Sequence, residues 1–443
     1  MAELSKNGAR IVRVAFPKQG GNRWSVINDK GVYFNRGIPD EAHMMMGFLA
    51  GVHGQVRHIA FDGDGSGWSI LSDGNKNEKV CDQAGCVSIV EMYRQITKRL
   101  DGKVVGCACS LGGAQPTYLS RGQARTSVDG GSRFFAPFTK TTVASVSKFV
   151  TALVAIKVLA KNDVSLDDPI GSHLPSDWHL DPVVAAITFR ELLSHRSGIK
   201  DYGNVSQEYD KVKAFFTQQV DTSKNTPCQG AAVIDPPDAI NANDKSPCYS
   251  NYNFAIFRIL LPWIDGVRDD SAQRASKLAA AFVRLAQQHV FEPVGAIGVQ
   301  AKPPSPASDQ AYSYVFPGSS SGQEWGDGTL GVGAAGWYLS IEDVAKVLHS
   351  LNRDDERILT HPQLADMEAT SLGWDVTRDG NGLRWVEKNG GWGTGKGSVS
   401  TSVALMGPGV YGALFINSNI SGEPGVGADA VLHDAFVAAY QKR

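Results

Sequence analysis

A nearly all-apolar segment that starts at Phe149 predicts a buried helix. Its apolar residues occupy almost every side of a helix, which is typical of a core helix rather than a surface one. A second segment, over residues 271–290, carries its apolar residues on one face and predicts an amphipathic helix. Shorter apolar runs predict a helix over 254–261 and a strand over 399–406. The apolar residues of the first segment are Phe149, Val150, Ala152, Leu153, Val154, Ile156, Val158 and Leu159.

The N-terminal part of the chain shows a different pattern, an internal repeat of paired strands. Each unit has two strand-like runs joined by a turn, with Trp24 and Trp68 at equivalent places, and each hairpin leads to a predicted helix. A further strand-like run over 103–107 fits a third copy and equally the first strand of the domain that follows. The strand pairs are 10–16 with 23–29 and 55–61 with 67–73, and the helices are 39–49 and 86–100.

Two such units bury little apolar surface by themselves. We therefore predict a small domain of β-hairpin/helix units over residues 1–82, packed against a larger domain over 83–443. The small domain groups no nucleophile with a base, so a structural role is the first expectation. A lid, a substrate-selecting wall or a surface for homo-oligomer formation is the functional alternative.

The most informative chemistry precedes the apolar helix, where Ser145 is followed by Lys148. Residues three apart share one face of a helix. Serine is a poor nucleophile until a neighbouring group accepts its proton, and a lysine can do so when burial lowers its pKa. The helix N-terminus adds unpaired N–H groups that favour developing negative charge. Ser145 is therefore a candidate nucleophile, and Lys148 is its candidate proton acceptor.

The Ser-x-x-Lys pattern alone is weak, since about two matches are expected by chance in a chain of this length. The sequence contains a second one, Ser197 with Lys200, in a stretch that predicts a loop. A Gly-x-Ser-x-Gly pattern centred on Ser320 lacks the preceding strand and following helix of a hydrolase elbow. The stretch 391–398 is not a phosphate-binding loop, because glycine follows Lys396 and no helix follows.

Two downstream motifs strengthen the first one. Tyr249-Ser250-Asn251 and Lys388-Asn389-Gly390-Gly391 follow it in the chain. Ser-x-x-Lys, Tyr-x-Asn and Lys-x-Gly in this order resemble the serine β-lactamase and penicillin-binding-protein-like superfamily, on the side of class C β-lactamases, family VIII carboxylesterases and D-peptidases. The resemblance covers residues from about 86 to 443. Further segments that match in order are 164–169, 192–198, 291–295, 336–340 with Asp343, and 372–374.

The resemblance implies a role for each motif residue. Ser145 attacks a carbonyl carbon and forms an acyl-enzyme, while Lys148 takes or relays its proton. Tyr249, flanked by two lysines, holds phenolate character and is the base for Ser145 and the acid for the leaving group. Asn251 orients Lys148 and the acyl group, and Lys388 supplies positive charge near Tyr249 and near a substrate carboxylate. The plainer alternatives are that Tyr249 is a packed aromatic residue and that Lys388 is an edge-strand lysine that discourages aggregation.

The rest of the third motif completes the implied site. The backbone N–H groups of Ser145 and Gly391 form the oxyanion hole. Glycines at 390 and 391 let substrate approach the backbone closely. Asn389 departs from the family, which often has Thr or Gly there. The departure keeps a hydrogen-bonding side chain but weakens the expectation that the site recognises a substrate carboxylate.

The resemblance also implies the architecture, an α/β (α+β) fold of the β-lactamase/transpeptidase type. Two pieces of the chain, roughly 86–144 and 331–443, form an antiparallel sheet flanked by helices. A mostly helical part, about 145–330, lies between them. The catalytic groups then meet at the interface of the two parts, a usual place for a ligand cleft.

Composition and charge agree with a globular enzyme. A chain of 443 residues allows two or three domains, and a net charge of -2 gives no electrostatic basis for binding nucleic acid. No apolar run approaches the roughly 18 residues that a membrane span needs. Residues 1–13 lack the apolar core of a signal peptide, which predicts a cytoplasmic protein, or an exported one if a leader has been removed.

The six cysteines do not identify the compartment. Cys107 and Cys109 alternate along a strand-like run and are expected to face one apolar layer. Cys228 and Cys248 bracket a polar loop and are candidates for a disulfide in an oxidising compartment. No cysteine has zinc-ligand spacing with histidines, so we expect no metal site.

Together these features predict a serine hydrolase or acyltransferase that cleaves a small ester, amide or peptide through an acyl-enzyme, with no cofactor. A class C-like esterase or amidase is favoured, because no signal segment is visible and the third motif departs from its strict form. A β-lactamase or a D-alanyl-D-alanine-type peptidase is the alternative enzyme. A catalytically silent β-lactam- or acyl-binding protein is the alternative of another class, and the intact set Ser145, Lys148 and Tyr249 argues against it.

Overall fold

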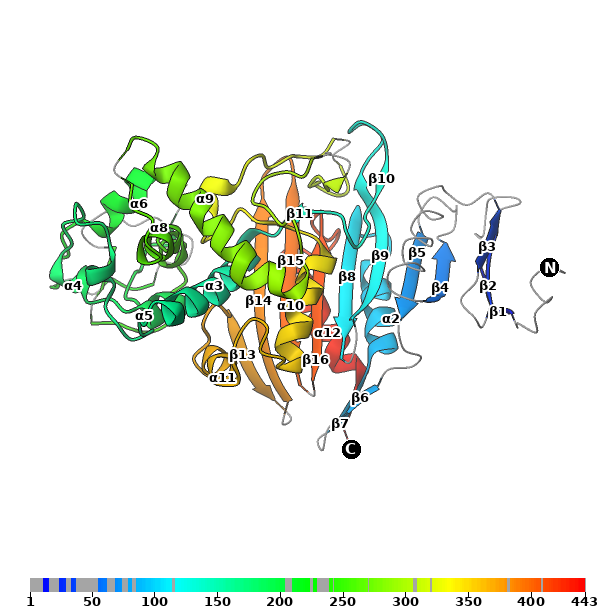
Figure 1. The fold of residues 1–443 in the computed structure, drawn as a ribbon. Coiled ribbons are helices and arrows are strands. Elements are labelled where there is room, and N and C mark those ends of the chain that lie inside the picture. The colour runs from blue at the N-terminus through cyan, green and yellow to red at the C-terminus, as the bar shows by residue number, and fades with distance from the viewer. Residues whose placement is uncertain are drawn as a thin grey trace.

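The structure is a computed structural model in which a central sheet lies between a helical region and the first three strands of the chain (Figure 1). It describes all three motifs of the candidate site. The described residues are 11–15, 24–28, 33–36, 55–61, 68–73, 79–81, 85–113, 116–203, 209–223, 226–228, 239–241, 243–269, 271–305, 309–318, 321–380, 383–407 and 409–442.

The central sheet is antiparallel and combines early and late parts of the chain. Within the described residues it has nine strands, in the order β13-β14-β15-β16-β8-β9-β5-β4, with β10 beside β9. The two predicted pieces join where β8 pairs with β16. The strands are β4 (Gln55–Phe61), β5 (Trp68–Asp73), β8 (Gly106–Gly112), β9 (Pro116–Arg125), β10 (Arg133–Phe134), β13 (Val376–Gly380), β14 (Leu383–Gly393), β15 (Ser398–Met406) and β16 (Val410–Ile416).

The two faces of this sheet bury separate apolar clusters. Along β8, Cys107 and Cys109 lie in one cluster and Ala108 lies in the other, because successive strand residues point to opposite faces. The prediction that the two cysteines share one apolar layer is confirmed. Their face of the sheet is covered by α2 (Ile89–Leu100) and α12 (Ala428–Ala439), and the other face by α10 (Ile341–Arg353).

The chain between the two sheet pieces is mostly helical, as predicted. At its centre is α3 (Ser147–Lys161), whose buried residues run almost continuously from Ser147 to Leu159, so the apolar segment is the core helix that its sequence predicts. The helix predicted over 271–290 is α9, which continues as a π-helical turn over Gln287–Phe291. The α-helices of this part, besides α3, are α4 (Pro182–Ala185), α5 (Phe189–Leu193), α6 (Tyr209–Phe216), α7 (Tyr252–Ala255), α8 (Phe257–Ile264) and α9 (Arg274–Ala286). The C-terminal piece contains a further helix, α11 (His361–Ala369).

The predicted N-terminal hairpins are present as strand pairs. In the first, β1 (Ile11–Ala15) pairs with β2 (Trp24–Asn28), and β3 (Tyr33–Arg36) completes a separate sheet. In the second, β4 pairs with β5, and β5 also pairs with β9, so this hairpin extends the central sheet. The helix predicted over 39–49 lies outside the described residues. The boundary at residue 82 stays a prediction.

The helix predicted over 86–100 begins later than expected. Residues Gly85–Ser88 form β7, which pairs with β6 (Lys79–Cys81) and β17 (Tyr440–Lys442). The Ser88 hydroxyl accepts a hydrogen bond from the Glu91 N–H at 3.3 Å. A serine that caps the first turn in this way favours a helix start at the next residue, which is where α2 begins.

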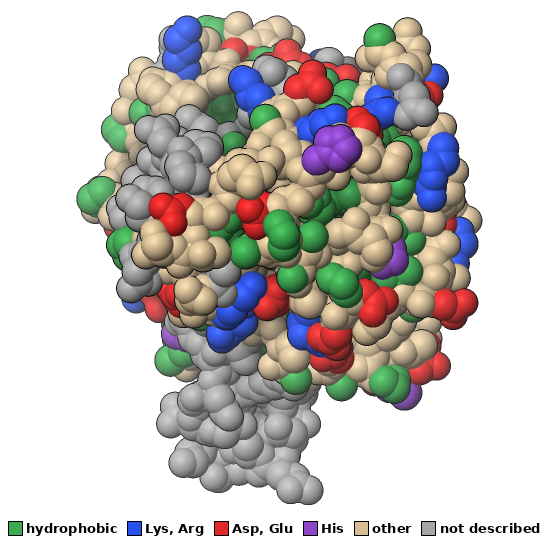
Figure 2. All heavy atoms as spheres, turned by 90° about the vertical axis from the view of Figure 1, so that its left-hand side faces the viewer, with side chains coloured by type: hydrophobic (Ala, Val, Ile, Leu, Met, Phe, Trp, Pro, Cys, Tyr) green, Lys and Arg blue, Asp and Glu red, His purple; other side chains and the backbone are tan. Residues whose placement is uncertain are grey.

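Two features of the described residues bear on the expected partners: the length of the helices and the charge of one face of the molecule. None of the helices in the described ranges combines the length and apolar character needed to cross a bilayer. Figure 2 faces the helical end of the molecule, and the described acidic and basic side chains on this face are interspersed.

Candidate active site

Ser145 lies in a tight turn that leads into α3. The turn is a 3-10 helix over Ala144–Val146, and α3 follows at once. Ala144 has a φ of 45°, in the left-handed region that a residue with a side chain rarely adopts. The chain therefore bends sharply just before Ser145, which stays half-buried while the residues on either side are buried. The prediction that Ser145 stands at the start of the core helix is confirmed.

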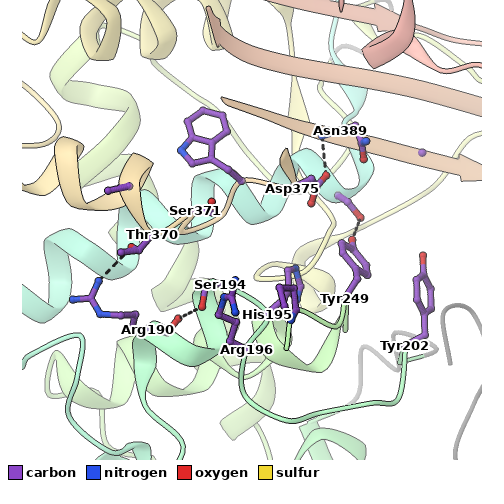
Figure 3. Close-up of a pocket in the computed structure, with 15 residues that line it drawn as sticks. Arg190, Ser194, His195, Arg196, Tyr202, Tyr249, Thr370, Ser371, Asp375 and Asn389 are labelled. Atoms are coloured by element: carbon purple, nitrogen blue, oxygen red, sulfur yellow. Dashed lines mark hydrogen bonds between the residues drawn. The ribbon is translucent and has the colours of Figure 1, made fainter. Parts of the chain in front are cut away.

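Two side chains converge on the Ser145 hydroxyl. The Tyr249 hydroxyl donates a hydrogen bond to Ser145 Oγ at 2.7 Å, and Lys148 Nζ lies 3.1 Å from the same oxygen. Lys148 reaches Ser145 from one turn along the chain, as the spacing of three residues predicts. Figure 3 shows Tyr249 close to Asp375 and Asn389, with its hydrogen bond to Ser145 drawn as a dashed line.

Lys148 is fully buried and has partners for each of its hydrogen-bonding positions. Its Nζ lies 2.7 Å from Asn251 Oδ1 and 2.7 Å from the carbonyl oxygen of Ala334. Burial lowers the pKa of Lys148 well below its usual value, and the positive charge of Lys388 lowers it further. A neutral amine donates two N–H groups, which Asn251 and Ala334 accept, so its lone pair faces Ser145. A proton acceptor needs this arrangement.

The Tyr249 ring lies near both buried lysines. Its centroid is 5.1 Å from Lys148 Nζ and 5.0 Å from Lys388 Nζ, so the predicted proximity is confirmed. The predicted phenolate character is wrong, because burial raises the pKa of Tyr249 well above its usual value and the negative charge of Asp375 raises it further. In the resting site Tyr249 is therefore a protonated phenol that donates its hydrogen bond to Ser145.

The residues on both sides of Tyr249 are anchored. The buried His195 accepts the Cys248 N–H at its carbonyl oxygen at 2.8 Å, and its Nδ1 lies 3.2 Å from the Ser250 backbone nitrogen, which donates to it. The His195 and Tyr249 ring centroids are 4.6 Å apart. Cys248 forms a disulfide with Cys228, which confirms the candidate pairing. The position of the Tyr249 hydroxyl therefore depends on both His195 and the disulfide.

We expect the Cys228–Cys248 disulfide to stabilise the fold. It joins residues with a sequence separation of 20 and so restricts the unfolded chain. A loop of this size contributes about 3 kcal/mol to stability. Replacing the exposed Cys228 by serine should lower the free energy of unfolding by about that amount in urea denaturation. A Cys228→Ser protein as stable as the oxidised wild type would contradict this expectation.

The third motif lies on β14, which packs against the Ser145 turn. Gly390 approaches this turn so closely that a Cβ atom there would lie 2.5 Å from the Val143 carbonyl oxygen, so a larger residue does not fit. The residues on either side, Asn389 and Gly391, line the same cavity as Ser145. The structure thus brings the Lys-x-Gly motif to the nucleophile, as predicted.

Two residues that sequence reasoning missed also lie in the site. Asp375 forms an ion pair with Lys388, and its Oδ2 accepts the Asn389 N–H at 3.1 Å (Figure 3). The second is Ala334, whose carbonyl oxygen accepts a hydrogen bond from the buried amine. Asp375 had a signal in the sequence, since it directly follows the matched segment 372–374. A backbone carbonyl such as that of Ala334 has none.

The site opens into a cavity of about 830 Å³, a size that suits a small-molecule substrate. Its walls come from both the helical part and the C-terminal piece of the chain, so the predicted cleft at their interface is confirmed. Within the described ranges no group of three or more His, Cys, Asp or Glu residues is placed to hold a metal ion. The lining residues are Ser145, Arg190, Ser194, His195, Arg196, Tyr202, Pro247, Tyr249, Ala369, Thr370, Ser371, Trp374, Asp375, Asn389 and Gly391.

The other sequence patterns considered for a nucleophile or a phosphate-binding loop do not form such sites among the described residues. Ser197 Oγ donates to Asn253 Oδ1 at 2.6 Å, and Lys200 forms an ion pair of 2.7 Å with Asp244, so these two residues do not act as a pair. The stretch 391–398 leads from β14 directly into β15, and no helix follows it. Ser320 lies outside the described residues.

The sequence matches the family model described as Beta-lactamase over residues 129–432, which is more than half of the chain. The chain belongs to the Beta-lactamase family. The matched range includes Ser145, Lys148, Tyr249 and Lys388, so the family assignment rests on the part of the chain that carries the site. No curated protein matches the sequence.

Solved structures of β-lactamase-like proteins share the fold. The octameric penicillin-binding protein homologue from Pyrococcus abyssi is 16% identical, with a TM-score of 0.55 over 78% of this chain and 76% of that one. The class C beta lactamase from Rhodobacter sphaeroides is 13% identical, with a TM-score of 0.54 over 79% and 97% of the two chains. The D-alanine carboxypeptidase AmpC from Burkholderia cenocepacia is 16% identical, with a TM-score of 0.54 over 79% and 98%. The predicted β-lactamase/transpeptidase-like fold is confirmed.

Proposed function

We propose that this member of the β-lactamase and penicillin-binding-protein-like serine hydrolases cleaves an ester or amide through an acyl-enzyme on Ser145. The observation that carries the proposal is the hydrogen-bonded chain from Tyr249 through Ser145 to Lys148, which ends on a buried amine. A serine that only starts a helix needs neither partner. The alignment of a phenol, a hydroxyl and an amine lone pair is what activation of a serine requires.

In the acylation step, the Ser145 hydroxyl proton passes to the Lys148 amine while Oγ bonds to the substrate carbonyl carbon. The carbonyl oxygen takes the electron pair and becomes an oxyanion, which we assign to the N–H groups of Ser145 and Gly391. Collapse of this intermediate breaks the bond to the leaving alcohol or amine, which takes its proton from the Tyr249 hydroxyl. Lys148 then returns a proton to Tyr249, so both groups recover their resting form.

Water completes the cycle by attacking the acyl carbon. The pair of Lys148 and Tyr249 takes a proton from this water, and the Ser145 oxygen regains a proton as the acid leaves. An alcohol or amine in place of water would give acyl transfer by the same steps. Asn251 keeps Lys148 in place for both half-reactions, because its Oδ1 accepts from Nζ while its Nδ2 donates to the Gly203 carbonyl at 2.9 Å.

For the substrate we favour an ester or amide of the esterase or amidase type, since Asn389 departs from the strict third motif. A β-lactamase or D-alanyl-D-alanine-type peptidase is the second candidate, and the presence of Lys388 within 5.0 Å of the Tyr249 ring centroid favours it. A catalytically silent acyl-binding protein is the candidate of another class. In such a protein the acyl-enzyme forms but is not hydrolysed. The presence of Lys148 and Tyr249 beside Ser145 argues against it, because the same pair can take a proton from the attacking water.

A panel of 4-nitrophenyl esters of increasing acyl length, assayed beside nitrocefin, tests the proposed substrate class. We expect turnover of at least one ester with a higher kcat/KM than that of nitrocefin. Faster turnover of nitrocefin than of every ester would support the second candidate. A single burst of nitrophenol, equal to the enzyme concentration and without further turnover, would support the silent binding protein and contradict the proposal.

A further inference from the structure

The carboxylate of Asp375 is held rigidly beside the third motif. Its backbone N–H donates to the Glu387 carbonyl at 2.8 Å, which extends the pairing of β13 and β14 to this residue. Its Oδ2 accepts the Asn389 N–H at 3.1 Å, and its Oδ1 pairs with Lys388 Nζ. With both oxygens and the backbone engaged, Asp375 has one defined position at the end of the cavity that holds Ser145.

The ion pair presents its negative end to the cavity. The Lys388 side chain is 1% exposed, whereas that of Asp375 is 14% exposed. Asp375 lines the cavity and Lys388 does not. A ligand beside Asn389 therefore meets the carboxylate, and the ammonium group behind it already has a partner of opposite charge. This arrangement opposes the binding of a second carboxylate, because the two negative charges would repel each other.

The other charged residues of the cavity wall do not change this picture near Asn389. Among the described residues, the arginines that line the cavity are Arg190 and Arg196. Arg190 is already paired with Asp167 at 2.7 Å and with Asp366 at 2.9 Å. Figure 3 shows Arg196 with Ser194 and His195, whereas Asp375 lies beside Asn389. Among the described residues that line the cavity, the charged side chain next to Asn389 is thus that of Asp375.

We propose that Asp375 is a specificity-determining residue, which occupies Lys388 and so selects substrates whose acyl part is uncharged over those that carry a carboxylate there. The proposal rests on the proposed function and adds to it the charge of the acyl group. It also changes the role expected for Lys388, which forms an ion pair with Asp375 instead of binding a substrate carboxylate. Replacing Asp375 by asparagine keeps the size of the side chain and removes the charge.

Two substrates of matched length test this proposal, the 4-nitrophenyl ester of pentanoic acid and the mono-4-nitrophenyl ester of glutaric acid. In the wild type, kcat/KM for the uncharged ester should exceed that for the anionic ester by about tenfold or more. In Asp375→Asn this ratio should fall by about tenfold. Because the ratio compares two substrates on one protein, a general loss of activity or of folded protein does not affect it.

Two variants separate charge from structure in this test. Asp375→Glu keeps the charge and should keep the preference for the uncharged ester. Asp265→Asn removes a carboxylate of similar exposure, 20%, from an ion pair with Lys161 and should leave the ratio unchanged. If Asp375→Asn does not fold, the wild-type ratio still decides.

A wild type that hydrolyses the anionic ester as well as the uncharged one, or an Asp375→Asn ratio equal to that of the wild type, would overturn the proposal. Either result leaves the proposed hydrolase function intact. Failure of the wild type to hydrolyse both esters would instead contradict that function for this substrate class and, with it, the proposal on Asp375.

Discussion

Ser145→Ala should abolish hydrolysis of every ester or amide that the wild-type protein cleaves, with a loss in kcat of about 10⁶-fold. The reason is that Ser145 Oγ is the atom on which Tyr249 and Lys148 converge, at 2.7 and 3.1 Å. Removing it leaves these two groups without a nucleophile to activate. Steady-state kinetics on the best 4-nitrophenyl ester, with circular dichroism to confirm folding, measures the effect.

Two other serines provide matched controls for this experiment. Ser197→Ala should keep most of the activity, because Ser197 belongs to a different hydrogen bond, with Asn253. Ser320→Ala should also keep most of the activity, since its sequence pattern lacks the elbow context. A loss at Ser320 comparable to that at Ser145 would show that the nucleophile has been assigned to the wrong motif.

Lys148→Ala and Tyr249→Phe should each lower kcat by at least about 10²-fold, the scale of lost general acid–base help. The double variant should lose little more than the worse single variant, because both groups belong to one proton-transfer unit. Because Lys148 must be unprotonated to accept the serine proton, wild-type activity should be full above its lowered pKa and should fall as the pH drops through that pKa. Kinetics of the four proteins across a pH series provide both measurements.

Small losses in kcat for the two single variants, which add up in the double variant, would mean that another residue acts as the base. His195 is the nearest alternative, with its ring centroid 4.6 Å from that of Tyr249. The structure gives His195 a different task, since its Nδ1 lies 3.2 Å from the Ser250 nitrogen and 3.1 Å from Asn253 Nδ2. Burial also lowers the pKa of His195 well below its usual value, which makes it a weak proton acceptor.

The part of the site that could be predicted from residue patterns is the local part. Ser145 and Lys148 are three positions apart at the start of a segment whose apolar pattern already indicates burial, so both their contact and the low pKa of Lys148 follow from the local sequence. Tyr249 reaches Ser145 from 104 positions away. No periodicity predicts a contact of that kind, and the expectation came from the order of motifs in the family.

The error on Tyr249 shows why the electrostatics of the site could not be predicted from its motifs. Two lysines near a phenol favour its ionised form, and both lysines lie where they were expected. The pKa of Tyr249 is nevertheless raised, first by burial and then by the negative charge of Asp375. The pKa of a group depends on all of its charged neighbours in space. Asp375 lies near Tyr249 because of the position of the loop before β13, which the motifs do not predict.

The pairing of the β4–β5 hairpin with another strand could not be predicted from the sequence either. The alternating pattern predicts that β4 and β5 form a hairpin, since their connection is short. It contains no information about the outer edge of β5, which pairs with β9 through the register from Ser69 with Arg121 to Ser72 with Tyr118. The second N-terminal unit therefore contributes strands to the sheet that also carries the catalytic strand β14.

The most direct test of the central claim is to label the protein with a fluorophosphonate, which reacts with activated serines without any need to know the substrate. Peptide mass spectrometry should place one adduct per chain on the peptide that contains Ser145, and Lys148→Ala should slow the labelling strongly. An adduct on any other serine, or no adduct on the folded protein, would contradict the assignment of Ser145 as the nucleophile.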